Sequence, residues 1–268
     1  MVLTKRTVWL RGTTALAVVL SMALAVPVSP AEEPPAGDTV ERAAETPPAK
    51  SEIKQRIPRA KTKYKGREIA VTMHYLGAPW LMRESRQREE DCAKMLGALG
   101  VKPGQTVCDL GCGNGFYTLQ LARMVGENGK ILAVDIQPEM LHMLEERAKE
   151  EQLANIEPLL GTPIDPQLAA DSVDLILLVD VYHEFSHPPQ MLAAMRKALK
   201  PGGRIALVEF RAEDPNVPIK PLHKMTKEQI LKEFPPNGLK LVEQFDELPW
   251  QHLMFFERGE LPAGKPRN

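Results

Sequence analysis

The amino-acid sequence predicts an α/β fold, a doubly wound sheet of seven strands that is mostly parallel and has an antiparallel last strand. Three observations predict it. From residue 106 onward, short apolar runs alternate with segments of helical period. Residues 173–179 are nearly all apolar, as expected for a strand that helices cover on both faces. The last two strands lie too close together in the chain for a helical crossover, so they must pair antiparallel.

The elements follow in chain order. A first helix is expected over residues 85–99, where apolar residues share one side. The seven strands are short apolar or alternating runs: 106–110, 130–136, 156–160, 173–179, 204–210, 239–245 and 252–256. Four helices follow strands one, two, four and five: from a glycine loop to residue 125, 138–152, 188–199 and 226–234. Pro138 suits the first turn of its helix and Thr226 suits an N-cap, whereas the glycines at 202–203 end the helix before them.

The chain before this domain has a different composition. Lys5, Arg6 and Arg11 precede an apolar run over residues 15–28, with small residues near 25 and 31. This pattern predicts a signal peptide over residues 1–31, cleaved near 25 or 31, and therefore an exported protein; an uncleaved membrane anchor is the alternative. Residues 32–65 are rich in proline and poor in large apolar residues, which predicts a linker. The domain is expected over residues 66–258, with a tail at 259–268 and no further membrane span.

Overall composition excludes some classes of function. The 268 residues carry a formal net charge of −1, which gives no electrostatic reason to expect a nucleic-acid partner. Three cysteines cannot form a disulfide framework. Because no large insertion lies between the fourth and fifth predicted strands and the predicted signal directs export, we expect a small molecule or a component of the cell envelope as the partner.

A glycine loop follows the first strand, at the position where open α/β sheets bind ligands. It contains Gly111, Gly113 and Gly115, it is preceded by Asp109, and Asp135 stands twenty residues beyond it at the end of the second strand. An acid at that place can accept hydrogen bonds from both ribose hydroxyls, so the pattern predicts an adenosine-type cofactor. The G-x-G-x-G spacing differs from the dinucleotide fingerprint G-x-G-x-x-G, and this makes a dehydrogenase a distant alternative.

The sequence Asp109-Leu-Gly-Cys-Gly-Asn-Gly-Phe116, together with residues 133–140 and 199–204, resembles class I S-adenosylmethionine-dependent methyltransferases. The resemblance extends over about residues 76–257, and the whole chain looks similar to exported bacterial members of that superfamily. It implies the Rossmann-like methyltransferase fold and S-adenosylmethionine as cofactor. Because an extra carboxylate would repel a pyrophosphate, Asp109 also fits a ligand with a cationic amino group better than a dinucleotide.

The resemblance also implies roles for individual residues. Asp109, Gly111 and Gly113 would line the methionine moiety, and Gly115 would open the following helix. Asp135 would hold the ribose and Ile136 would pack on the adenine, with Gly161 and Thr162 at the adenine edge. Many relatives have an acid where this chain has Thr162, and Asp165 is the substitute nearby. Asp180, at the end of the fourth strand, would lie beside the methionine end.

Three histidines are the candidates for catalysis. His183 follows the fourth strand, His223 lies in the loop after the fifth, and His252 begins the seventh. All three positions belong to the carboxyl edge of the sheet, so we expect them to converge over the transferred methyl group as a polar substrate site. A bound metal is the weaker version of this hypothesis, because sequence spacing alone is poor evidence for one. The chain is thus predicted to be a methyltransferase; a catalytically inactive module that binds S-adenosylmethionine or S-adenosylhomocysteine is the alternative.

Overall fold

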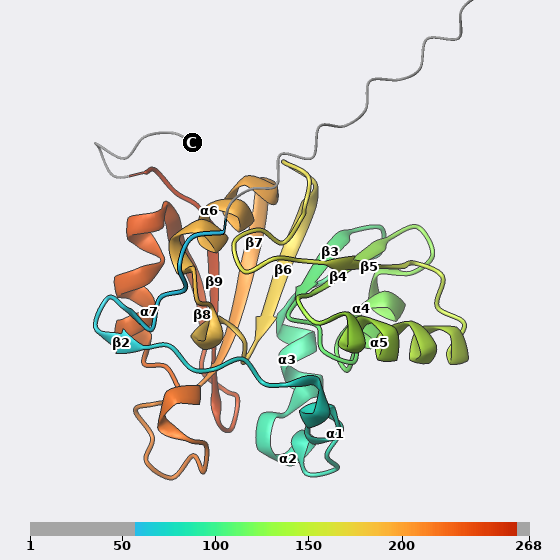
Figure 1. Cartoon of the computed structure of the whole chain (residues 1–268). Helices are drawn as coiled ribbons and strands as arrows, with labels where there is room; N and C mark the ends of the chain where they lie inside the picture. The colour runs from blue at the N-terminus through green and yellow to red at the C-terminus, as the bar shows by residue number, and fades with distance from the viewer. Residues whose placement is uncertain (1–56, 262–268) are drawn as a thin grey trace, which may run out of the picture. The chain divides into compact units, whose positions relative to one another are not determined.

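The computed structural model describes residues 57–261, and within it a mixed seven-stranded sheet runs through the folded unit (Figure 1). The predicted signal peptide, most of the predicted linker and most of the tail lie outside the described residues. The strands are arranged across the sheet in the following order: β5 (Ile156–Leu160), β4 (Lys130–Asp135), β3 (Thr106–Leu110), β6 (Val173–Val179), β7 (Leu199–Phe210), β9 (Gln251–Arg258) and β8 (Leu239–Phe245). β9 pairs antiparallel with both its neighbours, and all other pairs are parallel. The predicted fold class is confirmed.

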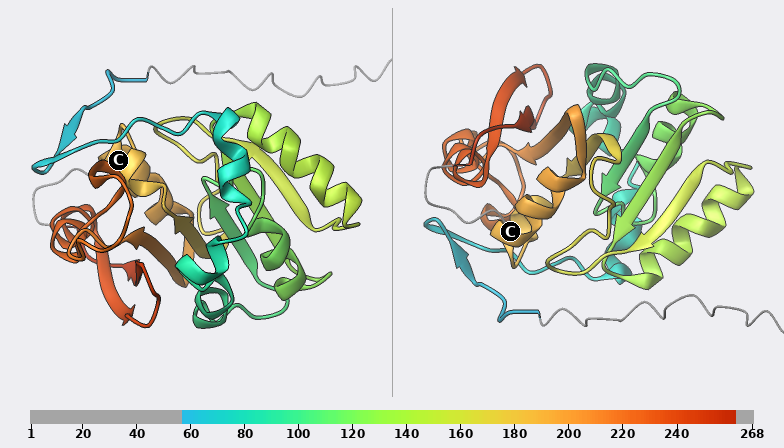
Figure 2. Two further views of the ribbon diagram at one scale, coloured as in Figure 1. Left: turned by 90° about the horizontal axis from the view of Figure 1, so that it is seen from below. Right: turned by 90° about the horizontal axis from the view of Figure 1, so that it is seen from above.

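Helices cover both faces of this sheet (Figure 2). One face carries α3 (Cys92–Ala98), α4 (Thr118–Val125) and α5 (Pro138–Glu150). The other carries α6 (Pro188–Ala198) and α7 (Lys227–Glu233). The strand order reverses between β3 and β6, because the chain first builds outward from β3 to β5 and then returns to the other side. The carboxyl ends of β3 and β6 therefore flank the switch point, where this class of sheet binds ligands.

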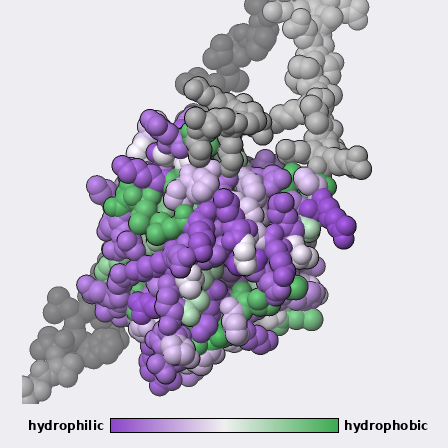
Figure 3. Space-filling view, turned by 90° about the vertical axis from the view of Figure 1, so that its left-hand side faces the viewer, coloured by the Kyte–Doolittle hydropathy of each residue, from purple (hydrophilic) through white to green (hydrophobic). Residues whose placement is uncertain are grey.

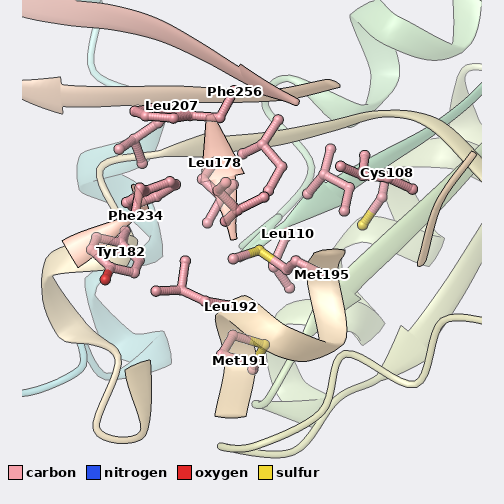
Figure 4. Close-up of a cluster of buried hydrophobic side chains, with 14 of the residues drawn as sticks. Cys108, Leu110, Leu178, Tyr182, Met191, Leu192, Met195, Leu207, Phe234 and Phe256 are labelled. Carbon is pink, nitrogen blue, oxygen red and sulfur yellow. The ribbon is translucent and has the colours of Figure 1, made fainter. Parts of the chain in front are cut away.

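The core lies on the two faces of β6 and its neighbours. Leu178, Leu207 and Phe256 project to the α6–α7 side, where they meet Met195 and Phe234 (Figure 4). Leu175, Leu177 and Phe255 project to the other side, towards α3 and α4. Since each large apolar side chain that is fully buried stabilises the fold by about 1.5–3 kcal/mol, these two clusters hold the strand ends that frame the switch point.

Two element boundaries differ from the sequence expectation. The helix predicted over residues 85–99 is two helices, α2 (Arg86–Glu90) and α3, because Asp91 adopts a left-handed conformation (φ 50°) and its side chain caps α3 by accepting a hydrogen bond from Lys94 N (3.3 Å). The fifth predicted strand begins five residues early, at Leu199. Leu199 pairs with Val173, and the register then shifts before Leu175 pairs with Arg204, so the glycines lie within an irregular strand.

Residues 58–77, which we call the strap, cross the carboxyl edge of the sheet from α7 towards α1 (Ala78–Leu81) (Figure 1). The strap contains β1 (Lys63–Tyr64) and β2 (Arg67–Glu68), which form a small antiparallel pair. This pair joins residues on both sides of the domain boundary predicted at residue 66. Backbone hydrogen bonds from Lys61 N to Ser186 O (3.0 Å) and from Ala70 N to His183 O (3.2 Å) fasten the strap to the loop after β6.

One buried ion pair anchors the strap to α7. Arg67 Nε lies 2.7 Å from Glu233 Oε1, and Tyr182 donates its hydroxyl hydrogen to Glu233 Oε2 (2.6 Å).

The face around α7 and β8 is mostly hydrophilic, with hydrophobic residues in separate groups (Figure 3). Among residues 57–261, no helix is both long enough and apolar enough to cross a bilayer.

Candidate active site

A cavity of about 470 Å³ lies at the carboxyl ends of β3, β4, β6 and β7, beneath the strap. Gly111 and Gly113 line it after β3, Asp135 lines it at the end of β4, and Ile136 follows that strand. Asp180, His183 and Glu184 follow β6, and Phe210 ends β7. The strap contributes Thr72 and Met73, and α1 contributes Trp80 and Leu81. The cavity is thus at the switch point that the sequence predicted for the ligand.

The glycine loop takes the shape that brings its backbone to the cavity. Gly111 has φ +77°, and a Cβ atom on it would lie 2.4 Å from Val181 Cγ2, so only glycine fits there. Gly113 N donates to Asp135 Oδ2 (3.0 Å), which joins the loop to the end of β4. Gly115 lies outside the cavity lining and packs against Leu144; its carbonyl oxygen accepts a hydrogen bond from Leu119 N (3.2 Å) in the first turn of α4.

Asp135 is buried but lines the cavity, as predicted for a ribose ligand. Its Oδ1 accepts a hydrogen bond from Gln137 N (2.9 Å), so both oxygens are held in place by backbone amides. Burial raises the pKa of Asp135, although these amide hydrogen bonds oppose the shift. Ile136 beside it is 42% exposed, which leaves an apolar surface on which a flat ring can pack.

The predicted adenine edge is also part of the lining. Gly161 N donates to Asp135 O (2.9 Å), and Thr162 Oγ1 accepts a hydrogen bond from Asp165 N (3.0 Å). The Asp165 carboxylate instead accepts from Gln167 N (2.7 Å) and is outside the lining. Asp165 therefore closes a turn, and the structure does not bring it to the cavity as the substitute acid.

Asp109 is placed differently from the expectation. Its Oδ2 accepts a hydrogen bond from the hydroxyl of Thr118 (2.6 Å), and the residue is 3% exposed and absent from the cavity lining. Burial raises its pKa to about 6, with the nearby Asp135 charge adding to the effect. The carboxylate lies behind the glycine loop, so it acts on the cavity through its charge rather than by contact.

Asp180 does line the cavity, in a left-handed conformation (φ 53°). Gln251 Nε2 donates to its Oδ2 (2.7 Å), and its Oδ1 is buried without a hydrogen-bond partner among the described residues. Burial raises the pKa of Asp180 well above its usual range, and the charges of Glu90 and Glu209 act in the same direction. A cationic ligand group would satisfy the orphaned oxygen.

Arg86 is a site residue that sequence reasoning did not find. It lines the cavity although it is almost fully buried. Its Nε lies 2.8 Å from Glu90 Oε2, and its Nη1 donates to Leu81 O (2.9 Å). Within residues 57–261, Nη2 donates no hydrogen bond, which leaves one donor for a ligand carboxylate. The i, i+4 spacing of Arg86 and Glu90 was readable from the sequence, but it is also common on solvent-exposed helices.

Two of the three predicted histidines meet at the cavity wall. His183 Nε2 lies 3.1 Å from His223 Nδ1, and Glu184 Oε1 lies 4.0 Å from each of these atoms. On its other side, His183 Nδ1 lies 2.7 Å from Oε2 of the fully buried Glu209. Burial alone would lower the pKa of His183, but the Glu209 carboxylate outweighs it, and the pKa of His183 is raised. For Glu184, burial raises the pKa to about 7.

The structure does not bring His252 into this group. Its Nε2 lies 2.8 Å from Glu213 Oε2, and the residue is absent from the cavity lining. The sheet register explains the difference. His252 lies opposite Glu209 on the neighbouring strand, so it is at the expected edge, but its ring is held by the loop after β7 instead of reaching His183. Glu184 takes the third place in the group.

Known proteins resemble this chain over the same region. A family model described as a methyltransferase domain matches residues 101–253, more than half of the chain. A demethylmenaquinone methyltransferase of Lactococcus lactis is 29% identical over 162 residues, which is 59% of this chain and 61% of that protein. A ubiquinone/menaquinone biosynthesis C-methyltransferase of Salmonella arizonae is 34% identical over 112 residues, 41% of this chain and 45% of that protein. The chain therefore spans less than two thirds of the length of these curated relatives.

Solved structures show the same fold. An S-adenosylmethionine-dependent methyltransferase from Aquifex aeolicus superposes with a TM-score of 0.65 at 26% identity, covering 69% of this chain and 98% of that one. A protein from Pyrococcus horikoshii superposes with a TM-score of 0.54 at 17% identity, over 65% of this chain and 90% of that one, and shares the fold alone. Because the family match extends from the glycine loop through the last strands of the sheet, this chain belongs to the methyltransferase-domain family, and the predicted resemblance to S-adenosylmethionine-dependent methyltransferases is confirmed.

Proposed function

We propose that this chain transfers a methyl group from S-adenosylmethionine to a small, largely apolar molecule that carries an ionisable oxygen, such as a hydroxylated aromatic ring. One observation carries the proposal. The polar group of His183, Glu184 and His223 lies in the same cavity as the glycine loop and Asp135, surrounded by apolar side chains. By their names, the two relatives reported above are a demethylmenaquinone methyltransferase and a ubiquinone/menaquinone biosynthesis C-methyltransferase. A quinol has this combination of an apolar ring and acidic hydroxyls.

The residues present fit the cofactor. Asp135 and Ile136 would hold the ribose and the adenine, with Gly161 and Thr162 at the ring edge. The orphaned Asp180 Oδ1 suits the α-amino group, and Arg86 has a free donor for the carboxylate. When bound, S-adenosylmethionine supplies an electrophilic methyl group on a sulfonium centre, which a nucleophile attacks in line.

The protein's own contribution is to position the acceptor and to exclude water. Val179, Phe185 and Phe210 give the cavity apolar walls around an aromatic ring. His183, held by Glu209, and Glu184, held by Met73 N (3.2 Å), are fixed before any acceptor binds. Such fixed polar groups at the end of an apolar cavity orient the oxygen of an acceptor. A carboxylate or imidazole among them can accept the hydroxyl proton, which leaves the ionised oxygen, the better nucleophile.

A transfer assay tests the proposal. The full chain is supplied with methyl-labelled S-adenosylmethionine and with panels of quinols, catechols and phenols, beside matched aliphatic amines and carboxylic acids. We expect label in a hydroxylated aromatic product, and we expect His223→Ala to lower kcat more than it changes the Kd of the cofactor. Transfer to amines alone would contradict the proposed acceptor class. Cofactor binding without transfer to any acceptor would identify the inactive binding module instead.

We further propose that the protein is exported. The support is the basic, apolar and small-residue pattern of residues 1–31, which lies outside the described residues. Fusion of residues 1–31 to a reporter enzyme that is active only outside the cytoplasm should give activity, and replacing Lys5, Arg6 and Arg11 by glutamate should abolish it. Equal reporter activity with and without the segment would refute export by this route.

A further inference from the structure

We propose that His183, Glu184 and His223 bind a divalent transition-metal cation of the Zn²⁺ type. Two imidazoles and one carboxylate form the protein ligand set of several catalytic zinc sites, in which a further position stays open for substrate. The three ligand atoms are His183 Nε2, Glu184 Oε1 and His223 Nδ1, and they lie within 4.8 Å of one another. They come from two separate loops, so this arrangement exists only in the folded chain.

The distances between the ligand atoms suit a metal ion. The two nitrogens are 3.1 Å apart, and Glu184 Oε1 is 4.0 Å from each. An ion placed equally far from all three would lie about 2.2 Å from each atom, against the 2.0–2.2 Å of zinc–nitrogen and zinc–oxygen bonds. That point lies in the plane of the three atoms. A tetrahedral ion needs ligand atoms about 3.4 Å apart, so the two 4.0 Å distances must shorten by about half an ångström, which side-chain rotation can supply.

The surroundings of the ligands support the same assignment. His183 Nδ1 lies 2.7 Å from the fully buried Glu209 carboxylate, the arrangement that fixes a metal-binding histidine with its other nitrogen towards the ion. Met73 N donates to Glu184 Oε1 (3.2 Å) and orients that carboxylate. Without a metal, one shared proton must lie between His183 Nε2 and His223 Nδ1; a cation replaces that proton and ligates both nitrogens.

Charge balance also favours a divalent cation. Glu184 and Glu209 bring two carboxylates to a buried wall of the cavity. The nearest guanidinium, Arg67, is already paired with Glu233 and donates its Nη1 hydrogen to His183 O (2.9 Å). A divalent cation would offset the negative charge of these two carboxylates.

The use of the metal rests on the proposed function, although its binding does not. The three ligand residues all line the cavity, so an open coordination position would face the acceptor. A cation there would hold the acceptor's hydroxyl oxygen and favour its ionised form, as metal ions do for bound water, with the proton passing to solvent. The substrate class then narrows to acceptors with a metal-binding oxygen, of which adjacent hydroxyl or hydroxyl–carbonyl pairs bind best.

Metal binding can be measured without cofactor or acceptor. The untagged full chain is stripped with a chelator and titrated calorimetrically with Zn²⁺, and Co²⁺ is added as an absorption probe of coordination. We expect one Zn²⁺ per chain and Co²⁺ bands typical of a low-coordinate site. Glu184→Gln and His223→Ala should weaken Zn²⁺ binding by more than about 100-fold, and Glu209→Gln by about 10–100-fold. The control His142→Ala, an exposed histidine of α5, should bind as wild type.

Three outcomes would overturn the inference: no stoichiometric Zn²⁺ binding by the wild-type chain, equal affinity in the Glu184→Gln variant, or equal loss in the control. Circular dichroism of each stripped variant separates loss of ligands from loss of fold, and the wild-type stoichiometry stands without any variant. If Zn²⁺ binds but no acceptor is methylated, the proposed function fails and the metal site stands. If methyl transfer survives complete removal of metal, the metal has no part in catalysis.

Discussion

Replacing Asp109 by asparagine should make the protein more stable at neutral pH. Asp109 is buried behind the glycine loop, and its pKa is raised from 3.8 to about 6. The folded state therefore holds its proton more tightly than the unfolded state does. As the pH rises from below 3.8 to above 6, the folded protein loses stability, because it must then keep a charge in a buried place. A tenfold change in proton affinity corresponds to about 1.4 kcal/mol, so the whole loss is about 3 kcal/mol.

The assay compares urea unfolding of the wild type and Asp109→Asn between pH 4.5 and pH 8. Asparagine cannot ionise, and its carbonyl oxygen still accepts the hydrogen bond from Thr118. The free-energy difference between variant and wild type should therefore grow in favour of the variant by about 2 kcal/mol over this range, the rest of the loss lying below pH 4.5. The control Glu247→Gln, an exposed acid, should show a difference that is nearly independent of pH.

A difference that stays flat with pH, or that falls, would refute the assignment of a raised pKa to Asp109. A second measurement, the affinity of the Asp109→Asn variant for S-adenosylmethionine, tests the effect of the same charge on function. Since the Asp109 charge lies close behind the loop that approaches the positively charged methionine end, the variant should bind S-adenosylmethionine more weakly while it is more stable. Such a trade between stability and activity is the expected reason for a buried carboxylate to be kept.

Further predictions concern the glycine loop, the ribose ligand and the strap. Gly111→Ala should lower the free energy of unfolding by about 2–4 kcal/mol, because a side chain at φ +77° is strained and would lie 2.4 Å from Val181 Cγ2. In the double variant with Val181→Ala, only the part of the lost free energy that comes from the clash should be recovered, because the backbone strain remains. A Gly111→Ala variant that is as stable as the wild type in denaturant unfolding would contradict this prediction. Asp135→Ala should raise the calorimetric Kd for S-adenosylmethionine at least about tenfold, since it removes both the ribose acceptor and the tether of the loop; an unchanged Kd would exclude the ribose role. Arg67→Met should cost about 3–5 kcal/mol by leaving Glu233 buried without its cation, and a double variant with Glu233→Met should regain much of the lost Tm. A small loss in the single variant would show that water replaces the guanidinium.

The cofactor half of the site was readable from the sequence because its signals are local. A glycine that needs φ +77° and an acid that ends the next strand are tied to each other by chain direction and sheet register. Gly111, Gly113, Asp135 and Ile136 accordingly all line the cavity. Asp109 belongs to the same motif, yet its side chain lies behind the loop, since a strand residue points to one face or the other and the motif does not say which face the ligand occupies.

The group of His183, Glu184 and His223, which we propose to face the acceptor, depended on contacts between distant segments. Topology correctly brought His183 and His223 to one edge of the sheet, but the same argument placed His252 there too. The topology predicts at which edge of the sheet a residue's Cα lies, but it does not predict which other residue its side chain contacts. From the sequence, Glu209 could be placed only at the rim of this edge, because a polar residue in a buried strand does not reveal which side chain it contacts. The strap was not identified as part of the site, since its first residues, 58–65, were expected to belong to the linker.

The sequence alone determined the class of fold and the positions of the glycine loop and of the acid that ends the next strand, because hydrophobic period and turn residues act over a few positions of the chain. Tertiary structure decided which polar groups meet. The group of His183, Glu184 and His223 requires β6 to lie beside β7, Glu209 to be buried behind it and the strap to close over it. These are long-range consequences of packing, and they bring the three side chains to the wall of the cavity beneath the strap.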